Sequence, residues 1–247
     1  MTTNGKIFEY LCKEFPLSDA LDFDNPGFLV GDREENTTGV VVSLDCDINT
    51  IDYAVKKGAN LVVTHHPVIF NPLKEVTEND VVYNAIKNGV SVISMHTNLD
   101  VSNKGTTVCL CESLGLKSIK KYIAKDGFAL RSAKVQMTAD TLAKTIKENL
   151  STAVRYVGEG EINTALVCSG SGGDYIDEAI ENGFDALITA DVKHKTFIEA
   201  INKKIAVFDC GHYQSEDVVV KPLSQMLEKK FKEISVFPVN NKKIKYI

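Results

Sequence analysis

The sequence has no apolar run long enough to cross a bilayer, and its polar first residues, Met1–Lys6, lead into no apolar segment. Neither a membrane span nor a secretory signal is therefore predicted, and the cytoplasm is the expected compartment. The six cysteines have neither paired CxxC spacing nor the spacing of a disulfide framework, so we interpret them as reduced thiols. Excess positive charge is also missing. The formal net charge of −5 argues against nucleic acid or an anionic membrane as a partner.

Short apolar runs alternate with amphipathic stretches along the first half of the chain. The predicted strands are 39–44, 60–64 and 90–95, and the predicted helices are 3–15, 48–57, 79–88 and 106–114. Residues 23–32 are expected to form a loop because turn-forming residues are frequent there. Residues 117–137 are expected to form extended strands that turn at Gly127. This alternation is typical of an α/β fold whose largely parallel sheet is covered by helices on both faces.

The second half of the chain repeats the pattern of the first. When residues 40–64 are set beside 165–189, six of 25 positions are identical, and strand, helix, glycine and strand follow in the same order. The identities, together with the matching order of strand, helix, glycine and strand, indicate an internal duplication. We therefore predict two similar α/β/α lobes with largely parallel sheets, one in residues 1–125 and the other in 126–247.

The histidines follow predicted strands, where open α/β sheets form their binding crevices. They are His65, His66, His96, His194 and His212, and an acid stands four residues after two of them, at Asp100 and Glu216. Imidazole and carboxylate without thiolate suit Zn²⁺, Mn²⁺, Fe²⁺ or Ni²⁺ in a site left open to water. If the two lobes face each other, these strand ends converge on one cleft. The alternative is a set of ordinary surface or hydrogen-bonded histidines.

The adjacent pair His65-His66 ends an apolar strand, and Pro67 prevents a helix directly after it. Neighbouring residues at a strand end point in different directions. We therefore expect each of these histidines to bind its own metal ion, with Glu216 as a bridging carboxylate. Two ions about 4 Å apart would activate water and stabilise a charged transition state.

A glycine-rich turn, Cys-Ser-Gly-Ser-Gly-Gly-Asp, lies between a strand and a helix at residues 168–174. Its backbone N–H groups are candidates for binding an anionic part of a substrate, at Ser169, Gly170, Ser171 and Gly172. The turn lacks the lysine of a P-loop and the GxGxxG spacing, so a tight turn without a ligand is the alternative. His194 and the nearby Asp191 are candidates for proton transfer or substrate contact, against the alternative of a solvated charged loop.

Five motifs, in the order in which they occur along the chain, resemble those of a known family. This family comprises the dinuclear-metal hexameric proteins labelled GTP cyclohydrolase I type 2 homologues, also called NGG-interacting factor three-like proteins. The motifs are Phe23-Asp24-Asn25-x-Gly27, Thr64-His65-His66-Pro67-x-x-Phe70, His96-Thr97-x-x-Asp100, Gly170-Ser171-Gly172 and Gly211-His212-x-x-Ser215-Glu216. The resemblance implies a two-lobed α/β/α fold, a toroidal homohexamer and two divalent metal ions per subunit. One departure is Lys195, which stands where many members of the family have a histidine.

Carried over by position, the resemblance gives this chain five metal-contacting residues. They are His65, His66, Asp100 and His212 as ligands and Glu216 as the residue that bridges or contacts both ions. His96 and the turn at Gly170 would line the same pocket. The metal would be Zn, Fe, Mn or Ni.

The expected function is metal-dependent hydrolysis of a small substrate that is nucleotide-like or phosphorylated. Glu216, His96 and His194 are the expected catalytic residues. The alternative is a protein that binds or handles metal, or regulates a partner, without turning over a substrate. The resemblance covers nearly the whole chain but does not select the reaction, because a fold and a metal site serve many reactions.

Overall fold

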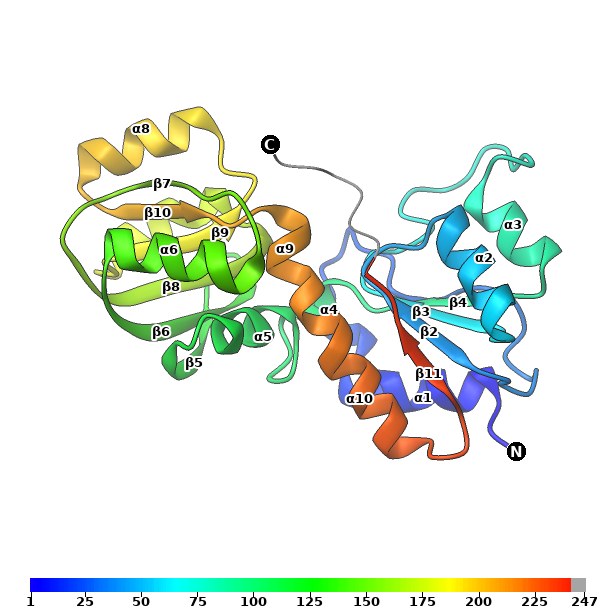
Figure 1. Cartoon of the computed structure of the whole chain (residues 1–247). Helices are drawn as coiled ribbons and strands as arrows, with labels where there is room; N and C mark the ends of the chain where they lie inside the picture. Colours follow the sequence, from blue (N-terminus) through cyan, green and yellow to red (C-terminus); the bar gives the residue numbers. More distant parts are fainter. Residues whose placement is uncertain (241–247) are drawn as a thin grey trace. The chain divides into compact units, whose positions relative to one another are not determined.

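The computed structural model describes residues 1–240, which form two compact units (Figure 1). Unit 1 contains Met1–Leu99 together with the described chain from Val220 onward, and unit 2 contains Asp100–Val219. The chain thus leaves unit 1 after its fourth strand and returns to it near the C-terminus. The predicted halves, 1–125 and 126–247, refer to the sequence repeat rather than to packing; they stay a prediction, and residues 241–247 lie outside the described residues.

Unit 1 is built on a five-stranded sheet in the order β1-β4-β3-β2-β11. Its strands are β1 (Gly27–Val30), β2 (Val40–Ser43), β3 (Leu61–Thr64), β4 (Ser91–Ser94) and β11 (Val236–Pro238). All neighbouring pairs are parallel except β1 with β4. The expected loop 23–32 therefore contains an antiparallel edge strand.

Helices cover both faces of this sheet (Figure 1). They are α1 (Asn4–Glu14), the 3-10 turn η1 (Leu17–Asp19), α2 (Ile48–Lys57), α3 (Val81–Lys87) and α10 (Val220–Lys230). Alternate residues of the strands point to opposite faces. Val41, Val62 and Val92 therefore pack with Ile51 and Ala54 of α2. Figure 1 shows α1 and α10 on the opposite face. The short helix α4 (Thr97–Asp100) follows β4.

Unit 2 is built on a six-stranded sheet in the order β5-β6-β8-β9-β10-β7. Its strands are β5 (Lys117–Ile123), β6 (Ala129–Thr138), β7 (Arg155–Val157), β8 (Glu161–Ser171), β9 (Ala186–Ala190) and β10 (Ala206–Asp209). Only β8, β9 and β10 pair in parallel. The other neighbouring pairs, β5 with β6, β6 with β8 and β7 with β10, are antiparallel. The first of these pairs is a hairpin around Gly127, which has φ +87°. This sheet is therefore mixed rather than largely parallel.

The helices of unit 2 also lie on both faces of its sheet. They are α5 (Thr106–Ser113), α6 (Ala139–Leu150), η2 (Gly173–Tyr175), α7 (Ile176–Glu181), α8 (His194–Lys203), α9 (His212–Glu216) and η3 (Asp217–Val219). Leu110 of α5 and Ile146 of α6 pack in one core cluster with Ile188 and Phe208 of the sheet. No helix within residues 1–240 is both long enough and apolar enough to cross a membrane.

Each unit contains a set of three parallel strands with the same connections, and this arrangement confirms the predicted α/β class. In unit 1 the chain runs β2-α2-β3 and then to β4, and in unit 2 it runs β8-α7-β9 and then to β10. Each set of three strands is parallel, with β3 or β9 in the middle. The predicted site residues lie at or after the carboxyl ends of these strands. Of the predicted turn at residues 168–174, the part up to Ser171 belongs to the end of β8.

Candidate metal centre

Three histidines of unit 1 lie together where β3 and β4 end. His65 and His66 follow β3, and His96 follows the neighbouring parallel strand. One potential ligand atom from each lies within 4.8 Å of the other two. The ring centroids are 4.9, 5.1 and 5.6 Å apart. This cluster could hold a metal ion, and it includes His96, which the sequence placed in the pocket but not among the ligands.

The two adjacent imidazoles lie side by side, which differs from the expectation that they point apart. The chain bends directly after β3: the N–H groups of His65 and His66 both donate to the carbonyl oxygen of Leu44, at 3.2 and 3.0 Å. The hydroxyl of Thr64 donates to the carbonyl oxygen of His66 at 2.8 Å. Because the backbone is no longer a regular strand here, strand alternation does not apply to the pair.

Each of these imidazoles is oriented by a hydrogen bond at Nδ1. The Nδ1 atoms of His65, His66 and His96 lie 2.9, 2.7 and 2.7 Å from the carbonyl oxygen of Met95, Oδ1 of Asp45 and Oδ1 of Asp24. A carbonyl oxygen only accepts, so Nδ1 of His65 carries the proton and its Nε2 has the lone pair that a metal requires. Metal-binding histidines typically donate their other ring N–H to a carboxylate or carbonyl oxygen in this way.

Asp24 is held as a carboxylate by the same contacts. Burial raises the pKa of Asp24, but hydrogen bonds from His96 and Thr97 outweigh that effect and lower it to about 2. Thr97 contributes both its backbone N–H, at 3.0 Å, and its hydroxyl, at 2.5 Å. The carboxylate therefore fixes His96 and the start of α4 together.

In unit 2, His212 and Glu216 stand one turn apart on α9. Nε2 of His212 lies 3.0 Å from Oε2 of Glu216, and its Nδ1 lies 2.7 Å from Oδ2 of Asp191. The hydrogen bond to Glu216, helped by the one to Asp191, raises the pKa of His212 to about 9 despite burial. Both ring nitrogens therefore face carboxylates, which favour the protonated imidazole in the metal-free protein.

The glycine-rich turn brings the acids of unit 2 together. The hydroxyl of Ser169 lies 3.5 Å from Oδ1 of the buried Asp100. Gly170 lies directly against Glu216, because a Cβ at Gly170 would overlap Oε1 of that carboxylate. Asp100, His212 and Glu216 thus surround two adjacent residues of the turn. A glycine is therefore required at position 170 because any side chain would occupy the space of the Glu216 carboxylate.

Two backbone donors of this turn are already used within unit 2. The N–H of Gly170 donates to the hydroxyl of Ser215 at 3.0 Å, and that of Gly172 donates to the hydroxyl of Thr189 at 2.8 Å. Ser171 is exposed. Substrate binding by residues 169–172 stays a prediction.

His194 lies apart from these groups. It is exposed as the first residue of α8. It belongs to none of the groups of potential metal ligands found among residues 1–240. Its catalytic role also stays a prediction.

Sequence reasoning missed Asp45 and did not assign Asp24 to an imidazole. Asp45 follows β2, and β2 pairs in parallel with β3 so that Ser43 lies opposite Thr64. An acid directly after the neighbouring strand was the available signal for Asp45. A hollow of about 250 Å³ adjoins His66 and Asp45 and is otherwise lined mostly by apolar side chains.

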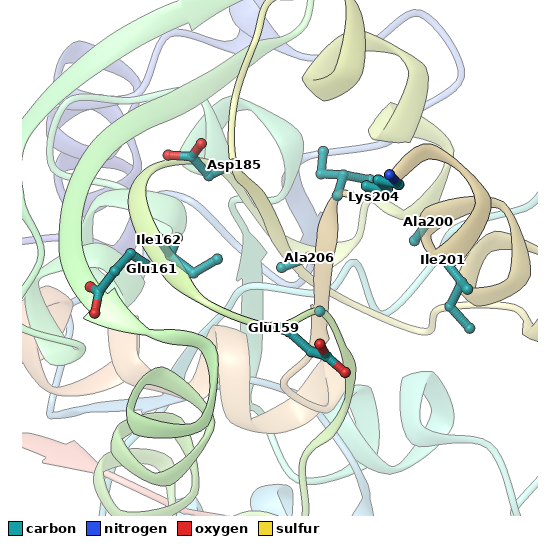
Figure 2. A pocket seen from close by; sticks show the side chains of 10 residues that line it. Glu159, Glu161, Ile162, Asp185, Ala200, Ile201, Lys204 and Ala206 are labelled. Atoms are coloured by element: carbon teal, nitrogen blue, oxygen red, sulfur yellow. The ribbon is translucent and has the colours of Figure 1, made fainter.

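A larger hollow, of about 480 Å³, lies at the other ends of the strands of unit 2 (Figure 2). It is lined by residues at the start of β8, before β9 and at the start of β10, including Ile162, Asp185 and Ala206. None of its lining residues is a predicted site residue. Glu159, Glu161 and Lys204 at its rim are exposed.

Comparison with known proteins decides the family. A sequence profile described as Duf34/NIF3 (NGG1p interacting factor 3) matches residues 2–244. The chain belongs to this family. Proteins called GTP cyclohydrolase 1 type 2 homolog are similar to it: that of Clostridium acetobutylicum is 32% identical over 228 residues, covering 86% of this chain and 85% of the relative. That of Campylobacter jejuni is 32% identical over 237 residues, covering 93% and 92%.

Solved structures with the same fold include two bacterial proteins. The Staphylococcus aureus hypothetical protein SA1388 matches with a TM-score of 0.91 and 27% identity, covering 100% of this chain and 99% of that one. A Bacillus cereus protein related to NIF3 matches with a TM-score of 0.90 and 17% identity, covering 99% of each chain. The predicted family and fold are thus confirmed.

Proposed function

We propose that this NIF3-family protein binds two divalent metal ions per subunit and hydrolyses a small nucleotide-like or phosphorylated substrate. The proposed metal-contacting residues are His65, His66, Asp100, His212 and Glu216. One observation carries the proposal: the Nδ1 atoms of four imidazoles, three in unit 1 and one in unit 2, all lie within 2.9 Å of a carbonyl or carboxylate oxygen. That is the arrangement of metal-binding histidines.

The donor atoms of each unit fit a divalent ion with borderline ligand preferences. Unit 1 offers imidazoles, and unit 2 offers one imidazole with the buried carboxylates of Asp100 and Glu216. Ions held by such donors supply Lewis acidity and activate water at neutral pH. Glu216 is the proposed proton acceptor. His96, oriented by Asp24, is the proposed proton donor or a further ligand.

Two exposed phenyl rings beside His96 support a substrate with a flat ring. The ring of Phe70 meets His96 edge-on with centroids 6.2 Å apart, and Phe23 lies 6.3 Å from Phe70. These side chains are 44% and 66% exposed, whereas apolar rings are normally buried. Asn25 joins the two loops through a 2.7 Å hydrogen bond to the carbonyl oxygen of Ile69. A nucleobase stacks well on such rings.

Metal content tests the first part of the proposal. The purified protein, incubated with Zn²⁺, Mn²⁺, Fe²⁺ or Ni²⁺ and desalted, should retain two ions per chain. His65→Ala and Glu216→Gln should retain fewer while keeping their circular dichroism. His194→Ala is the matched control, because His194 is exposed and outside the clusters, and it should retain two ions. Full retention in both His65→Ala and Glu216→Gln would contradict the ligand assignment.

Turnover tests the second part. The metal-loaded protein should hydrolyse at least one member of a panel of nucleotides and phosphoesters, and removal of the metal should abolish that activity reversibly. Two bound ions without turnover on the panel would favour the non-catalytic alternative, a metal-handling or regulatory protein.

Stacking is tested separately by binding. Phe23→Ala and Phe70→Ala should each weaken nucleotide binding by about tenfold, since a stacked base contributes about 1–3 kcal/mol. Binding of ribose phosphate should be unchanged. Ile86→Ala, at a 64% exposed position on α3, is the control. Equal losses for nucleotide and ribose phosphate would argue against a ring site.

The homohexamer remains a proposal that rests on the family resemblance, and the cytoplasmic location remains a proposal that rests on the sequence, in which neither a secretory signal nor a membrane span is predicted. Sedimentation of the purified chain should give six times the mass of the subunit, 27.1 kDa. A monomer or dimer at micromolar concentration would contradict the assembly.

A further inference from the structure

Asp209, the last residue of β10, binds three segments of unit 2 at once. Its side chain is only 7% exposed. Oδ1 accepts the N–H of Gly211 at 3.1 Å, and Oδ2 accepts the N–H of Val192 at 3.2 Å. Oδ2 also accepts a hydrogen bond from the guanidinium of Arg155 on β7. The carboxylate therefore joins β7, the loop after β9 and the residue directly before α9.

The segments that Asp209 joins carry His212 and its hydrogen-bond acceptor. Val192 directly follows Asp191, whose Oδ2 lies 2.7 Å from Nδ1 of His212. Gly211 directly precedes His212. Arg155 also donates to the carbonyl oxygen of Val192 at 3.1 Å, so both backbone groups of Val192 are held.

This attachment is needed because the backbone at Asp191 is strained and the side chains of Asp191 and His212 are partly exposed. Asp191 has φ +52°, and Gly211 has φ +77°. Left-handed conformations persist at non-glycine residues only where the surroundings impose them. The side chains of Asp191 and His212 are 53% and 38% exposed, so water competes for their hydrogen bond. A fixed backbone on both sides limits that competition.

We propose that Asp209, with Arg155, is a positioning residue that sets the orientation of His212, with its Nδ1–H directed at Asp191. Asp209 belongs to none of the groups of potential metal ligands found among residues 1–240. The inference rests on the proposed function only for its effect on metal binding; the effect on the imidazole concerns the protein itself. The competing explanation is an ion pair that stabilises unit 2 without influence on His212.

Asp209→Asn keeps the size of the side chain but replaces one accepting oxygen with a donor. Asp185→Asn is the matched control. Asp185 is another carboxylate of unit 2, and it accepts the backbone N–H groups of Asn163 and Thr164 at 3.0 and 2.9 Å. It lies before β9, at the opposite ends of the strands from His212. Both substitutions should therefore lower the urea midpoint.

Two readouts separate positioning from stability. In metal-free protein, proton NMR should show a slowly exchanging Nδ1–H of His212, identified by its loss in His212→Gln. Its exchange should become at least tenfold faster in Asp209→Asn and stay unchanged in Asp185→Asn. Zinc affinity should fall about tenfold or more in Asp209→Asn only, as for other groups that orient metal ligands.

An unchanged Nδ1–H signal in Asp209→Asn, with a urea midpoint lowered as in Asp185→Asn, would overturn the inference. If Asp209→Asn does not fold, Arg155→Gln replaces it; that variant keeps the carboxylate and should accelerate the exchange in the same direction. No acceleration there would equally overturn the inference. Wild-type protein that binds no metal but shows the protected Nδ1–H would contradict the proposed function and leave the positioning role supported.

Discussion

Replacing Gly170 with alanine tests whether the lack of a side chain at this position is what leaves space for the carboxylate of Glu216. Gly170 is buried and has φ +63°, and a Cβ there would overlap Oε1 of Glu216 and lie 3.5 Å from Cε1 of His212. A left-handed backbone costs a non-glycine residue about 1–2 kcal/mol. The collision adds to this cost, and it is relieved only if the buried carboxylate moves.

Gly183 provides a control with the same backbone but no collision. It has φ +70° in unit 2, and a Cβ there would meet nothing within 4 Å. Gly183→Ala should therefore lose only the backbone term of about 1–2 kcal/mol, which lowers the melting temperature by about 2–8 °C in a domain of this size. Gly170→Ala should lose at least as much.

Metal affinity distinguishes the two variants. A zinc titration against a chromophoric chelator should show about 10–100-fold weaker binding in Gly170→Ala, because Glu216 no longer occupies its place beside His212. Gly183→Ala should bind like the wild type once its folded fraction is taken into account. If the two variants bind zinc equally well, either Glu216 is not a ligand or the turn does not position it.

Three further predictions concern the groups around the imidazoles. Asp45→Asn should weaken zinc binding about tenfold in the same titration, because His66 loses its charged acceptor; unchanged affinity would show that this contact does not matter. The pKa of Asp24 is depressed to about 2, so its contribution to stability is present above its ordinary value of 3.8 and is lost as pH falls through about 2. Urea midpoints should fall more steeply there in the wild type than in Asp24→Asn, and parallel curves would refute the assignment. For His212 the sign is opposite: with a pKa raised from 6.5 to about 9, its contribution in metal-free protein is complete below 6.5 and is lost as pH rises through about 9. His212→Gln should flatten that slope in urea titrations, and an equal slope in the variant would exclude the His212–Glu216 pair as its source.

Local chemistry made several elements predictable. The helix Ile48–Lys57 has the predicted bounds, since Asp47 accepts the N–H of Thr50 at its start and Gly58 ends it with φ +68°. The position of His65 and His66 after a buried strand was equally predictable, because β-branched residues and Pro67 define that boundary. These features depend on neighbours within a few residues.

The contacts that orient the imidazoles depend instead on distant parts of the chain. Asp24 and His96 are 72 positions apart, and Asp45 and His66 are 21 apart. Nothing in one sequence states which of 33 acids approaches which histidine. The return of β11 to the edge of β2 in unit 1 was hidden for the same reason, since strand pairing between distant segments is decided by packing.

The internal repeat explains why the candidate metal ligands of the two units stand on similar backbones but differ in residue type. Thr64 and Thr189 occupy equivalent positions at the ends of β3 and β9, and both are fully buried. The hydroxyl of Thr64 donates to the carbonyl oxygen of His66, just after its own strand, and that of Thr189 donates to the carbonyl oxygen of Gly170, near the end of the neighbouring strand β8. The duplicated threonine therefore fixes backbone near a strand end in both units, whereas its partner segments diverged.

That divergence has a consequence for metal choice. The candidate ligands of unit 1 are all imidazoles, and the carboxylates there are hydrogen-bonded to imidazoles rather than placed among the candidate ligands. Those of unit 2 include the carboxylates of Asp100 and Glu216. Imidazoles favour Zn²⁺, Fe²⁺ or Ni²⁺, while carboxylates alone would accept Mg²⁺ or Ca²⁺ equally well. In the proposed function, the histidines of unit 1 provide metal selectivity and the acids of unit 2 provide negative charge. Replacing imidazoles in unit 1 should then change which metal binds, whereas replacing Glu216 should weaken the binding of every metal.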